Sequence, residues 1–177
     1  MNKNKPKAKV YIDGANIFYT QKKLGWSLDW QKTKDYLGKR WDIIEYRYYI
    51  GLKQGDDNVR SYLKYLDCIN FTIIAKPLKI IEIDQNHPLH QLHNYREIHK
   101  CNFDVEISTD ISFDRTKIDE IILFSGDSDF KYLIEKIKSV GKKMIIFSSR
   151  KTIAWELKLA ASEYFFIEDL EKELKRA

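Results

Sequence analysis

Asp127 and Asp129 stand two residues apart, directly after a run of large apolar residues. That run, residues 121–124, is too short for a helix and rich in β-forming residues, so it predicts a strand buried on both faces. Apolar residues at helical spacing follow over residues 130–140, and Gly141 is placed to end that helix. The two acids therefore lie on a strand-to-helix turn at the carboxyl end of a strand, where open α/β sheets place their binding sites.

Two further acids fall at comparable places along the chain. Asp13 ends a short predicted strand over residues 9–12 and is followed by glycine and a helical segment. Asp104 and Asp110 flank one narrow apolar stripe of helical spacing on opposite sides. If the strands before Asp13 and Asp127 are neighbours at a switch in strand order, both carboxylates open into one crevice. Asp104 is expected nearer to that crevice than Asp110, whose part in it is left open.

Ordinary structural roles are sufficient for any one of these acids. A Ser or Asp at the start of a helix commonly serves only as its cap. Acids are also numerous, because the chain has 26 Asp and Glu residues and some must fall near strand ends. One cap accounts for one acid only, however, and the set of Asp13, Asp127 and Asp129 is much harder to explain in this way.

Carboxylates gathered at one place repel each other and raise each other's pKa, so they need a cation unless they share protons. Oxygen ligands without a framework of Cys and His favour a hard ion, Mg²⁺ or Mn²⁺. A hard divalent ion held by acids, with positions left open to water, is suited to phosphodiester hydrolysis. The acids therefore predict a metal-dependent hydrolase of phosphate esters.

Other chemistries find less support in the sequence. The chain has no G-x-G-x-x-G, no Walker A motif and no G-x-S-x-G elbow. Three histidines in the polar stretch 84–100, His87, His90 and His93, are spaced by three and would share a face if Pro88 began a helix. A metal site there is less favoured than an exposed polar insertion, because two-His helical sites need further ligands.

The remaining elements alternate between the two types of structure. Strands are expected over residues 43–50, 71–75, 144–147 and 164–167, and residues 78–83 extend or pair with the strand before Pro77. Helices are expected over residues 15–24, 30–37, 59–66, 153–161 and 170–174. The alternation predicts an α/β fold of three layers, α/β/α, with a central mostly parallel sheet in a single domain over residues 9–177.

Composition and charge set the broad class. The chain has 177 residues, 44% hydrophobic and 32% charged, with no apolar run long enough to span a bilayer and no signal peptide. The two cysteines predict free thiols in a reducing compartment, which favours a cytoplasmic protein without membrane contact. Residues 1–8 are expected to form a basic flexible tail. Its lysines carry much of the net charge of +5, and it is either a solvated end or a phosphate-binding arm.

Three motifs, in order, resemble a known family. They are YIDGANI over Tyr11–Ile17, DVEISTD over Asp104–Asp110 and SGDSDF over Ser125–Phe130. This set resembles the NYN domains of the LabA-like group, within the PIN-like nucleases. The resemblance implies a parallel sheet of order 3-2-1-4-5 and cleavage of RNA dependent on Mg²⁺ or Mn²⁺, with Asn16 as a polar residue behind the ligands or facing phosphate. Carried over, it implies these metal-binding acids: Asp13, Asp104, Asp127 and Asp129.

The sequence thus predicts a metal-dependent endoribonuclease, with DNA not excluded as a substrate. Lys131 and Arg150 are candidate substrate contacts beside Asn16. Lys131 lies in the helix just after Asp129, and Arg150 follows the carboxyl end of the next strand, on the same rim as the strand ends that carry the acids. The alternative is a non-catalytic RNA-binding or regulatory module that keeps the same NYN fold. A small-molecule phosphohydrolase is the weaker third hypothesis, since Asp13 lacks the second acid two residues on that aspartyl-phosphate enzymes use.

Overall fold

A single parallel sheet organises the protein. The structure, a computed structural model, describes residues 5–53, 55–82, 84 and 97–177. The sheet has six strands in the order β3-β2-β1-β6-β7-β8, and all of its neighbours pair in parallel. In chain order its strands are β1 Lys7–Asp13, β2 Asp42–Leu52, β3 Thr72–Pro77, β6 Glu120–Phe124, β7 Lys143–Ser148 and β8 Glu163–Phe166. The predicted order 3-2-1-4-5 is confirmed, and β8 adds a sixth strand at the edge.

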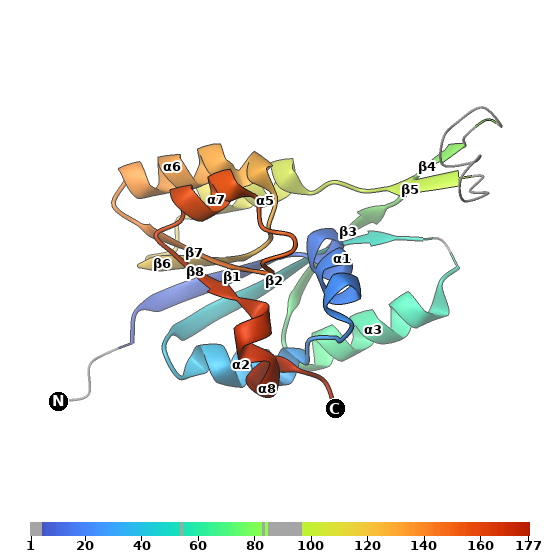
Figure 1. The fold of residues 1–177 in the computed structure, drawn as a ribbon, viewed down its shortest axis with the longest axis horizontal. Helices are drawn as coiled ribbons and strands as arrows, with labels where there is room; N and C mark the ends of the chain where they lie inside the picture. The colour runs from blue at the N-terminus through green and yellow to red at the C-terminus, as the bar shows by residue number, and fades with distance from the viewer. Residues whose placement is uncertain (1–4, 54, 83, 85–96) are drawn as a thin grey trace.

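Helices cover both faces of the sheet, so the predicted three layers are also confirmed. Figure 1 shows α5, α6 and α7 on one face and α1, α2, α3 and α8 on the other. The helices are α1 Gly14–Leu24, α2 Trp30–Gly38, α3 Asp57–Cys68, α5 Asp104–Phe113, α6 Lys131–Ser139, α7 Trp155–Ala160 and α8 Glu171–Leu174. Two short 3-10 helices complete the body of the protein: η1 Ser128–Phe130 and η2 Ile167–Leu170.

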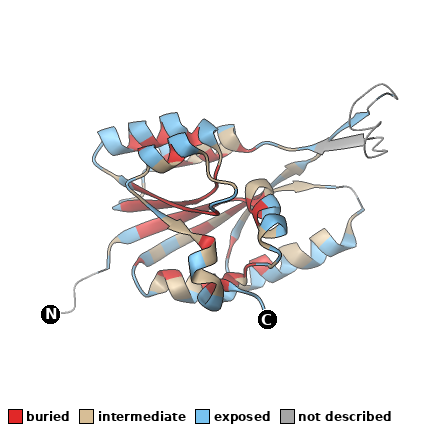
Figure 2. Cartoon of the chain, in the orientation of Figure 1, coloured by how far each residue is buried: buried red, intermediate tan, exposed pale blue. Residues whose placement is uncertain are grey.

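The two sides of the sheet have different cores, and the central strands are buried between them (Figure 2). On the α2 side the rings of Phe124, Phe147 and Phe165 stack across three adjacent strands, with centroids 4.7 and 4.8 Å apart. On the other side aliphatic residues of α5 and α6 pack on Leu123 and Ile146. All five residues of β6 are buried, as its apolar run predicts. The strand that ends at the paired acids is therefore held rigidly on both faces.

The first strand begins earlier than the sequence predicts. Lys7 and Ala8, the last two residues of the expected tail, already belong to β1. Lys9 is only 5% exposed, and its Nζ lies 2.6 Å from an oxygen of Asp114 and 3.1 Å from one of Glu45. Its charge can be buried because two carboxylates pair with it. Lys9 is therefore part of the sheet and is not a solvated or phosphate-binding lysine.

A two-stranded antiparallel sheet extends from the body beyond β3 (Figure 1). It pairs β4 Lys79–Glu82 with β5 Glu97–Lys100, so β4 does not pair with the strand before Pro77 as expected. Proline has no N–H to donate, and the parallel ladder ends at that residue. The end of the stretch 84–100, predicted to be irregular, is thus a strand. The three histidines singled out by their spacing lie outside the described residues: His87, His90 and His93.

Both cysteines are free thiols, as predicted. Cys68 is exposed at the end of α3, and Cys101 is half-buried just before α5, where burial raises the pKa of its thiol. A raised pKa leaves little thiolate, so the Cys101 thiol is a poor nucleophile. No helix in the described ranges has the length and apolar character needed to cross a membrane.

Candidate metal centre

Three carboxylates converge at the carboxyl edge of the sheet. Asp104 begins α5, Asp127 follows β6 and Asp129 lies in η1. Each offers one oxygen, and these oxygens all lie within 4.8 Å of one another. Within the described ranges, no Lys or Arg forms an ion pair with any of the three acids. We call this set the acidic group.

Local hydrogen bonds set the geometry of the acidic group. Asp127 caps η1, because its Oδ1 accepts the N–H of Asp129 at 3.1 Å. The Asn102 side chain accepts the N–H of Asp104 at 2.7 Å and so fixes the start of α5. Capping of η1 is therefore a sufficient structural role for Asp127. The carboxylates of Asp104 and Asp129 have no such capping role. Asn102 precedes its helix without a recognisable motif, which is why the sequence did not single it out.

Asp13 lies behind the acidic group and is outside it. It is 7% exposed; its Oδ1 accepts the N–H of Asn16 at 3.1 Å, and its Oδ2 accepts the hydroxyl of Ser125 at 3.1 Å. Burial, with added repulsion from the charges of Asp104 and Asp127, raises the pKa of Asp13 to about 6. The fourth predicted acid is therefore close enough to interact electrostatically with the group, although hydrogen bonds already engage both of its oxygens.

Repulsion also acts within the acidic group. The pKa of Asp104 is raised by its burial and, to a lesser degree, by the neighbouring charges of Asp127 and Asp129. Carboxylates that oppose each other's ionisation in this way are stabilised by a shared cation. All of the donors are oxygens, which suits Mg²⁺ or Mn²⁺ better than a softer metal. The residues present therefore fit the ion that the sequence implies.

Asn16 joins the two strand ends that carry the acids. Its side-chain oxygen accepts the N–H of Gly126 at 3.0 Å, and the hydroxyl of Ser125 accepts the N–H of Asp127 at 3.2 Å while it donates to Asp13. Asn16 thus acts here as a positioning residue. Ser125 was not predicted as a site residue, because a serine in a turn gives no signal of a contact to a strand far away in the sequence.

Two glycines allow the close approach of these turns. A Cβ on Gly14 would lie 2.4 Å from the carbonyl oxygen of Tyr49, and one on Gly126 would lie 2.5 Å from that of Thr152. Real Cβ atoms do not come so close to backbone atoms. Each glycine directly adjoins an acid, Asp13 or Asp127, so the glycine lets the strand end pack against its neighbour at the point where the carboxylate emerges.

Asp110 lies outside the acidic group and has a different role. Its Oδ2 accepts the hydroxyl of Tyr49 at 2.7 Å and the guanidinium of Arg47 at 3.0 Å. Both partners belong to β2, so Asp110 fastens α5 to the sheet. Asp104 begins the same helix, and its position depends in part on this attachment. Asp104, in the first turn of α5, is the one of the two acids that reaches the strand ends, as the sequence suggested.

The two basic residues predicted to contact substrate make other contacts. Lys131 is exposed and lies 3.8 Å from Glu135 one turn along α6. Arg150 forms two hydrogen bonds to Asp169, at 2.8 and 2.7 Å, and its guanidinium lies 4.1 Å from the ring centroid of Phe166. The side chains of Arg150 and Asp169 are each about half exposed. Such exposed pairs are weak, so an incoming phosphate can displace the carboxylate from Arg150.

Lys76 is a basic residue that sequence reasoning missed. It lies near the end of β3, pairs with Glu106 in the first turn of α5, and sits 4.4 Å from the ring of Phe103. Glu106 is two residues from Asp104 along the helix. The sequence gives no indication of this position, because Lys76 reaches α5 only through the pairing of β3 with β2.

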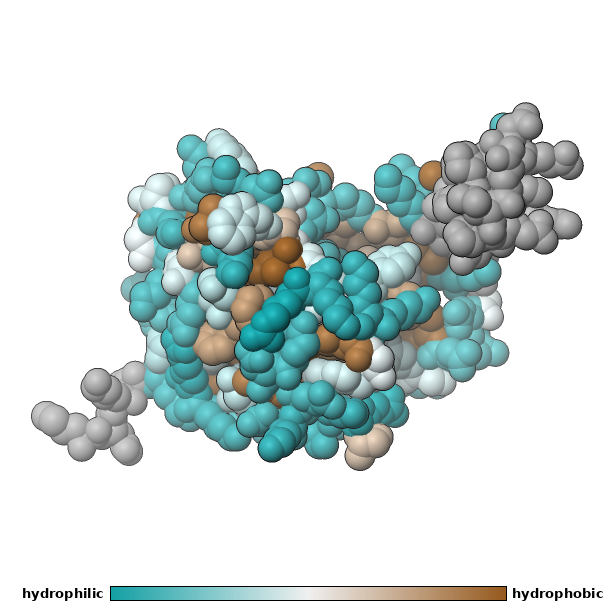
Figure 3. Space-filling model, in the orientation of Figure 1, coloured by the Kyte–Doolittle hydropathy of each residue, from teal (hydrophilic) through white to brown (hydrophobic). Residues whose placement is uncertain are grey.

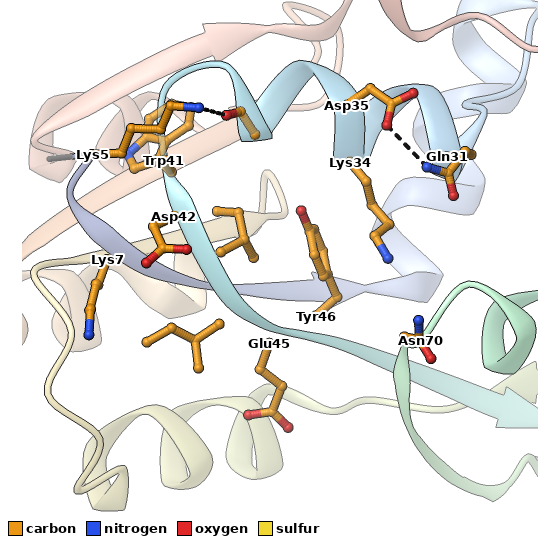
Figure 4. A pocket seen from close by; sticks show the side chains of 13 residues that line it. Lys5, Lys7, Gln31, Lys34, Asp35, Trp41, Asp42, Glu45, Tyr46 and Asn70 are labelled. Atoms are coloured by element: carbon orange, nitrogen blue, oxygen red, sulfur yellow. Dashed lines mark hydrogen bonds between the residues drawn. The ribbon is translucent and has the colours of Figure 1, made fainter. Parts of the chain in front are cut away.

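A groove lies at the opposite edge of the sheet (Figure 4). It has a volume of about 1050 Å³ and lies along the first half of β2 and α2. Lysines and acids both line it, among them Lys5, Lys34, Asp35 and Glu45, and Tyr46 forms part of its wall. Its positive and negative side chains are balanced in number, and the three carboxylates of the acidic group do not line it. The chemistry is therefore to be sought at the carboxyl edge.

Comparison with known proteins agrees with this geometry. The profile of the NYN domain matches residues 7–168, which is most of the chain. The chain belongs to the NYN domain family. It is also 32% identical over 163 residues to the low amplitude and bright protein LabA of Synechococcus elongatus, covering 91% of this chain and 83% of that one. The LabA-like resemblance of the sequence is thereby confirmed.

A solved structure shares the fold of this NYN protein. The crystal structure of a protein of unknown function from Vibrio parahaemolyticus superimposes with a TM-score of 0.76. The two chains are 20% identical, and 99% of each is covered. At this identity the likeness concerns the fold alone. It extends over the whole NYN chain, including the strand ends that carry the acids.

Proposed function

We propose that this NYN protein is a metal-dependent endoribonuclease that hydrolyses phosphodiester bonds of RNA at the acidic group. The observation that supports it most is the convergence of the carboxylates of Asp104, Asp127 and Asp129, with no basic residue of the described chain paired to them. A protein that only bound RNA would gain nothing from three repelling acids at the point where phosphates must approach. Membership of a family with a nuclease-like fold supports the same conclusion.

The acidic group would hold Mg²⁺ or Mn²⁺, with Asp13 as a fourth carboxylate behind it. An ion at this place supplies a Lewis acid for the phosphate and lowers the pKa of an attacking water. The protein's own part is to fix its acids in place. Asn16, Ser125 and Asn102 do so through the hydrogen bonds described above, so the carboxylates need not reorganise when substrate binds.

Basic residues at the same edge would bind the phosphates on either side of the scissile bond. Arg150 follows β7 and Lys131 follows η1, both beside strand or turn ends that adjoin the acidic group. Arg150 offers two parallel N–H donors, now used by Asp169, in the geometry that a phosphate also accepts. We assign to these two residues the binding of the sugar-phosphate backbone of the substrate. Contacts to phosphate do not distinguish RNA from DNA.

The direct test is cleavage of internally labelled RNA and of DNA of the same sequence, each with Mg²⁺, with Mn²⁺ and with a chelator. We expect internal cuts in RNA that require a divalent ion. Asp127→Asn should lower the rate by about a hundredfold or more, because it replaces a charged ligand by a neutral amide. Asp42→Asn is the matched control, since Asp42 is exposed at the start of β2, at the far edge of the sheet.

Two results would contradict the proposal. If the wild type cuts neither polymer with either ion, the protein is not a nuclease. RNA binding that persists without cleavage would then favour the non-catalytic regulatory module. If cleavage persists in Asp127→Asn at the wild-type rate, it comes from a contaminant or from a different site.

A further inference from the structure

An exposed tryptophan lies beside the acidic group. Trp155 is the first residue of α7, and its side chain is 64% exposed. The N–H of Ala154 donates to the carbonyl oxygen of Gly126 at 2.8 Å. Trp155 and Asp127 each follow directly after one partner of this hydrogen bond. The backbone that carries the indole therefore lies beside the backbone that carries a predicted metal ligand.

From Trp155, basic groups and aromatic rings lie next to each other along α7 and the edge strand β8. The Nζ of Lys158 lies 5.7 Å from the ring centroid of Trp155, 5.1 Å from that of Tyr164 and 5.4 Å from that of Phe166. Phe166 also lies under the guanidinium of Arg150, as described. We call these five residues the aromatic strip. Figure 3 shows hydrophobic and hydrophilic residues side by side on the face of the molecule where α7 lies.

Packing does not account for the strip. Trp155 and Tyr164 are exposed, and neither they nor Phe166 belong to the hydrophobic core on either side of the sheet. Two such strips from two copies would bring like charges together, since each carries Lys158 and Arg150. A polyanion with planar groups is complementary both to the rings and to the cations. Single-stranded nucleic acid has these two properties, because its bases are free to stack and its phosphates are charged.

We propose that the aromatic strip binds single-stranded RNA, with an unpaired base stacked on the indole of Trp155 and the adjoining phosphates on Lys158 and Arg150. The inference rests on the proposed function for its choice of polymer, and it specifies the substrate. A duplex cannot place a base on the indole, because its bases are already stacked and paired. The strip would therefore favour unpaired segments over helices at the acidic group.

The test is a binding titration in chelator, where cleavage does not occur. The probes are a short oligouridylate and a blunt RNA duplex of the same length. Oligouridylate should quench the tryptophan fluorescence of the wild type, because a stacked base quenches an indole. Trp155→Phe should abolish that quenching and retain most of the affinity, since a phenyl ring still offers a stacking face. Trp155→Ala should weaken oligouridylate binding about 5- to 100-fold and leave duplex binding unchanged.

Phe113→Ala is the matched control. Phe113 is 78% exposed and ends α5, the helix that Asp104 begins, so it lies about 14 Å from Asp104 along the helix axis. Its removal should change neither the affinity nor the quenching. Circular dichroism of each variant checks the fold, and the phenylalanine variant carries the test if the alanine variant does not fold.

Several outcomes would overturn the inference. They are quenching that persists in Trp155→Phe, wild-type affinity of Trp155→Ala for oligouridylate, and equal losses for oligouridylate and duplex. A wild-type dimer in sedimentation that Trp155→Ala converts to monomer would assign the strip to a second copy instead. The result is independent of catalysis. A protein that cuts RNA without using Trp155 refutes this inference alone, and one that stacks RNA on Trp155 without cutting refutes the proposed function alone.

Discussion

Among single residues, Asp13 is one whose ionisation the fold makes clearly unfavourable. Its carboxyl is buried, and the charges of Asp104 and Asp127 add to the effect of burial, so its pKa rises from an ordinary 3.8 to about 6. As pH rises, Asp13 loses its proton at a lower pH in the unfolded chain than in the folded protein. Between about pH 4 and pH 6 the folded state binds more protons, so stability falls as pH rises through this window. Above it, the ionised carboxylate costs about 3 kcal/mol.

The first prediction follows from this cost. Asp13→Asn should raise the free energy of unfolding by about 1–3 kcal/mol near neutral pH, because the amide keeps the cap and the bond from Ser125 but carries no charge. The gain should shrink towards about pH 4 and vanish below about pH 3, where the wild-type carboxyl is protonated in both states. Urea denaturation in chelator at several pH values measures it. A gain that is the same at every pH would show that charge is not its cause.

At the scale of the elements, glycines control how closely the strand ends approach. A Cβ on Gly126 would lie 2.5 Å from the backbone of Thr152 and 2.6 Å from the hydroxyl of Ser148. Gly126→Ala should therefore force the turn before Asp127 away from the loop after β7. We expect it to cost about 1–3 kcal/mol of stability and to lower RNA cleavage, since the acid moves with the turn.

Gly38→Ala is the matched control for that change. Gly38 ends α2, nothing lies near the place of its missing Cβ, and its φ is not in the left-handed region. Alanine there should leave cleavage close to that of the wild type and should keep stability the same or raise it by up to about 1 kcal/mol. Thermal denaturation and the RNA assay compare the two variants. Equal behaviour of the two alanine variants would mean that the turn before the acids tolerates displacement.

Elements set by strong local patterns were predictable from the sequence. The apolar run before Asp127 gave β6 its buried position, and its abrupt end placed the paired acids at the edge of the sheet. The pairing of β4 with β5 was missed, because β5 lies at the end of a polar stretch and neither short strand alternates apolar with polar residues. The start of β1 was also missed, since Lys7 and Ala8 join the strand by pairing with Asp42 and Ile43 of β2, which only the tertiary fold brings to them.

The same distinction holds within the candidate site. Strand ends and helix starts predicted the places of Asp13, Asp104, Asp127 and Asp129. The contacts that hold these acids, from Asn102, Ser125 and the side chain of Asn16, join segments far apart in the sequence or use residues of common types. No local pattern predicts such bonds. Arg150 was expected to be free for phosphate, and its partner Asp169 comes from the segment after β8.

For the whole molecule, the placement of charge governs binding. The net charge of +5 is modest, and Lys5 and Lys7, from the basic amino-terminal segment, lie at the sheet edge opposite the acids. Lys5 there donates to the carbonyl of Gly38. Phosphate affinity must therefore come mainly from basic residues near the carboxyl edge. Arg150 is one of them, and Asp169 competes with phosphate for it.

This competition gives two predictions of opposite sign. Arg150→Ala should weaken RNA binding and reduce the slope of log affinity against log salt by about 0.7, which is one phosphate contact. Asp169→Asn should strengthen binding, because it frees the guanidinium without removing it. Fluorescence anisotropy of labelled RNA over a range of salt measures both. If both variants shift the affinity in the same direction, the Arg150–Asp169 pair acts on the fold and not on RNA.

The most direct test of the proposed metal centre is to measure Mn²⁺ binding in the absence of RNA. The electron paramagnetic resonance signal of the free ion reports how much Mn²⁺ is bound. If Asp104, Asp127 and Asp129 hold a divalent ion, the wild type binds Mn²⁺, and Asp127→Asn binds it about tenfold or more weakly because one charged ligand is lost. Asp42→Asn should bind as the wild type does. Equal Mn²⁺ affinity of the wild type and Asp127→Asn would contradict the assignment of the metal to the acidic group.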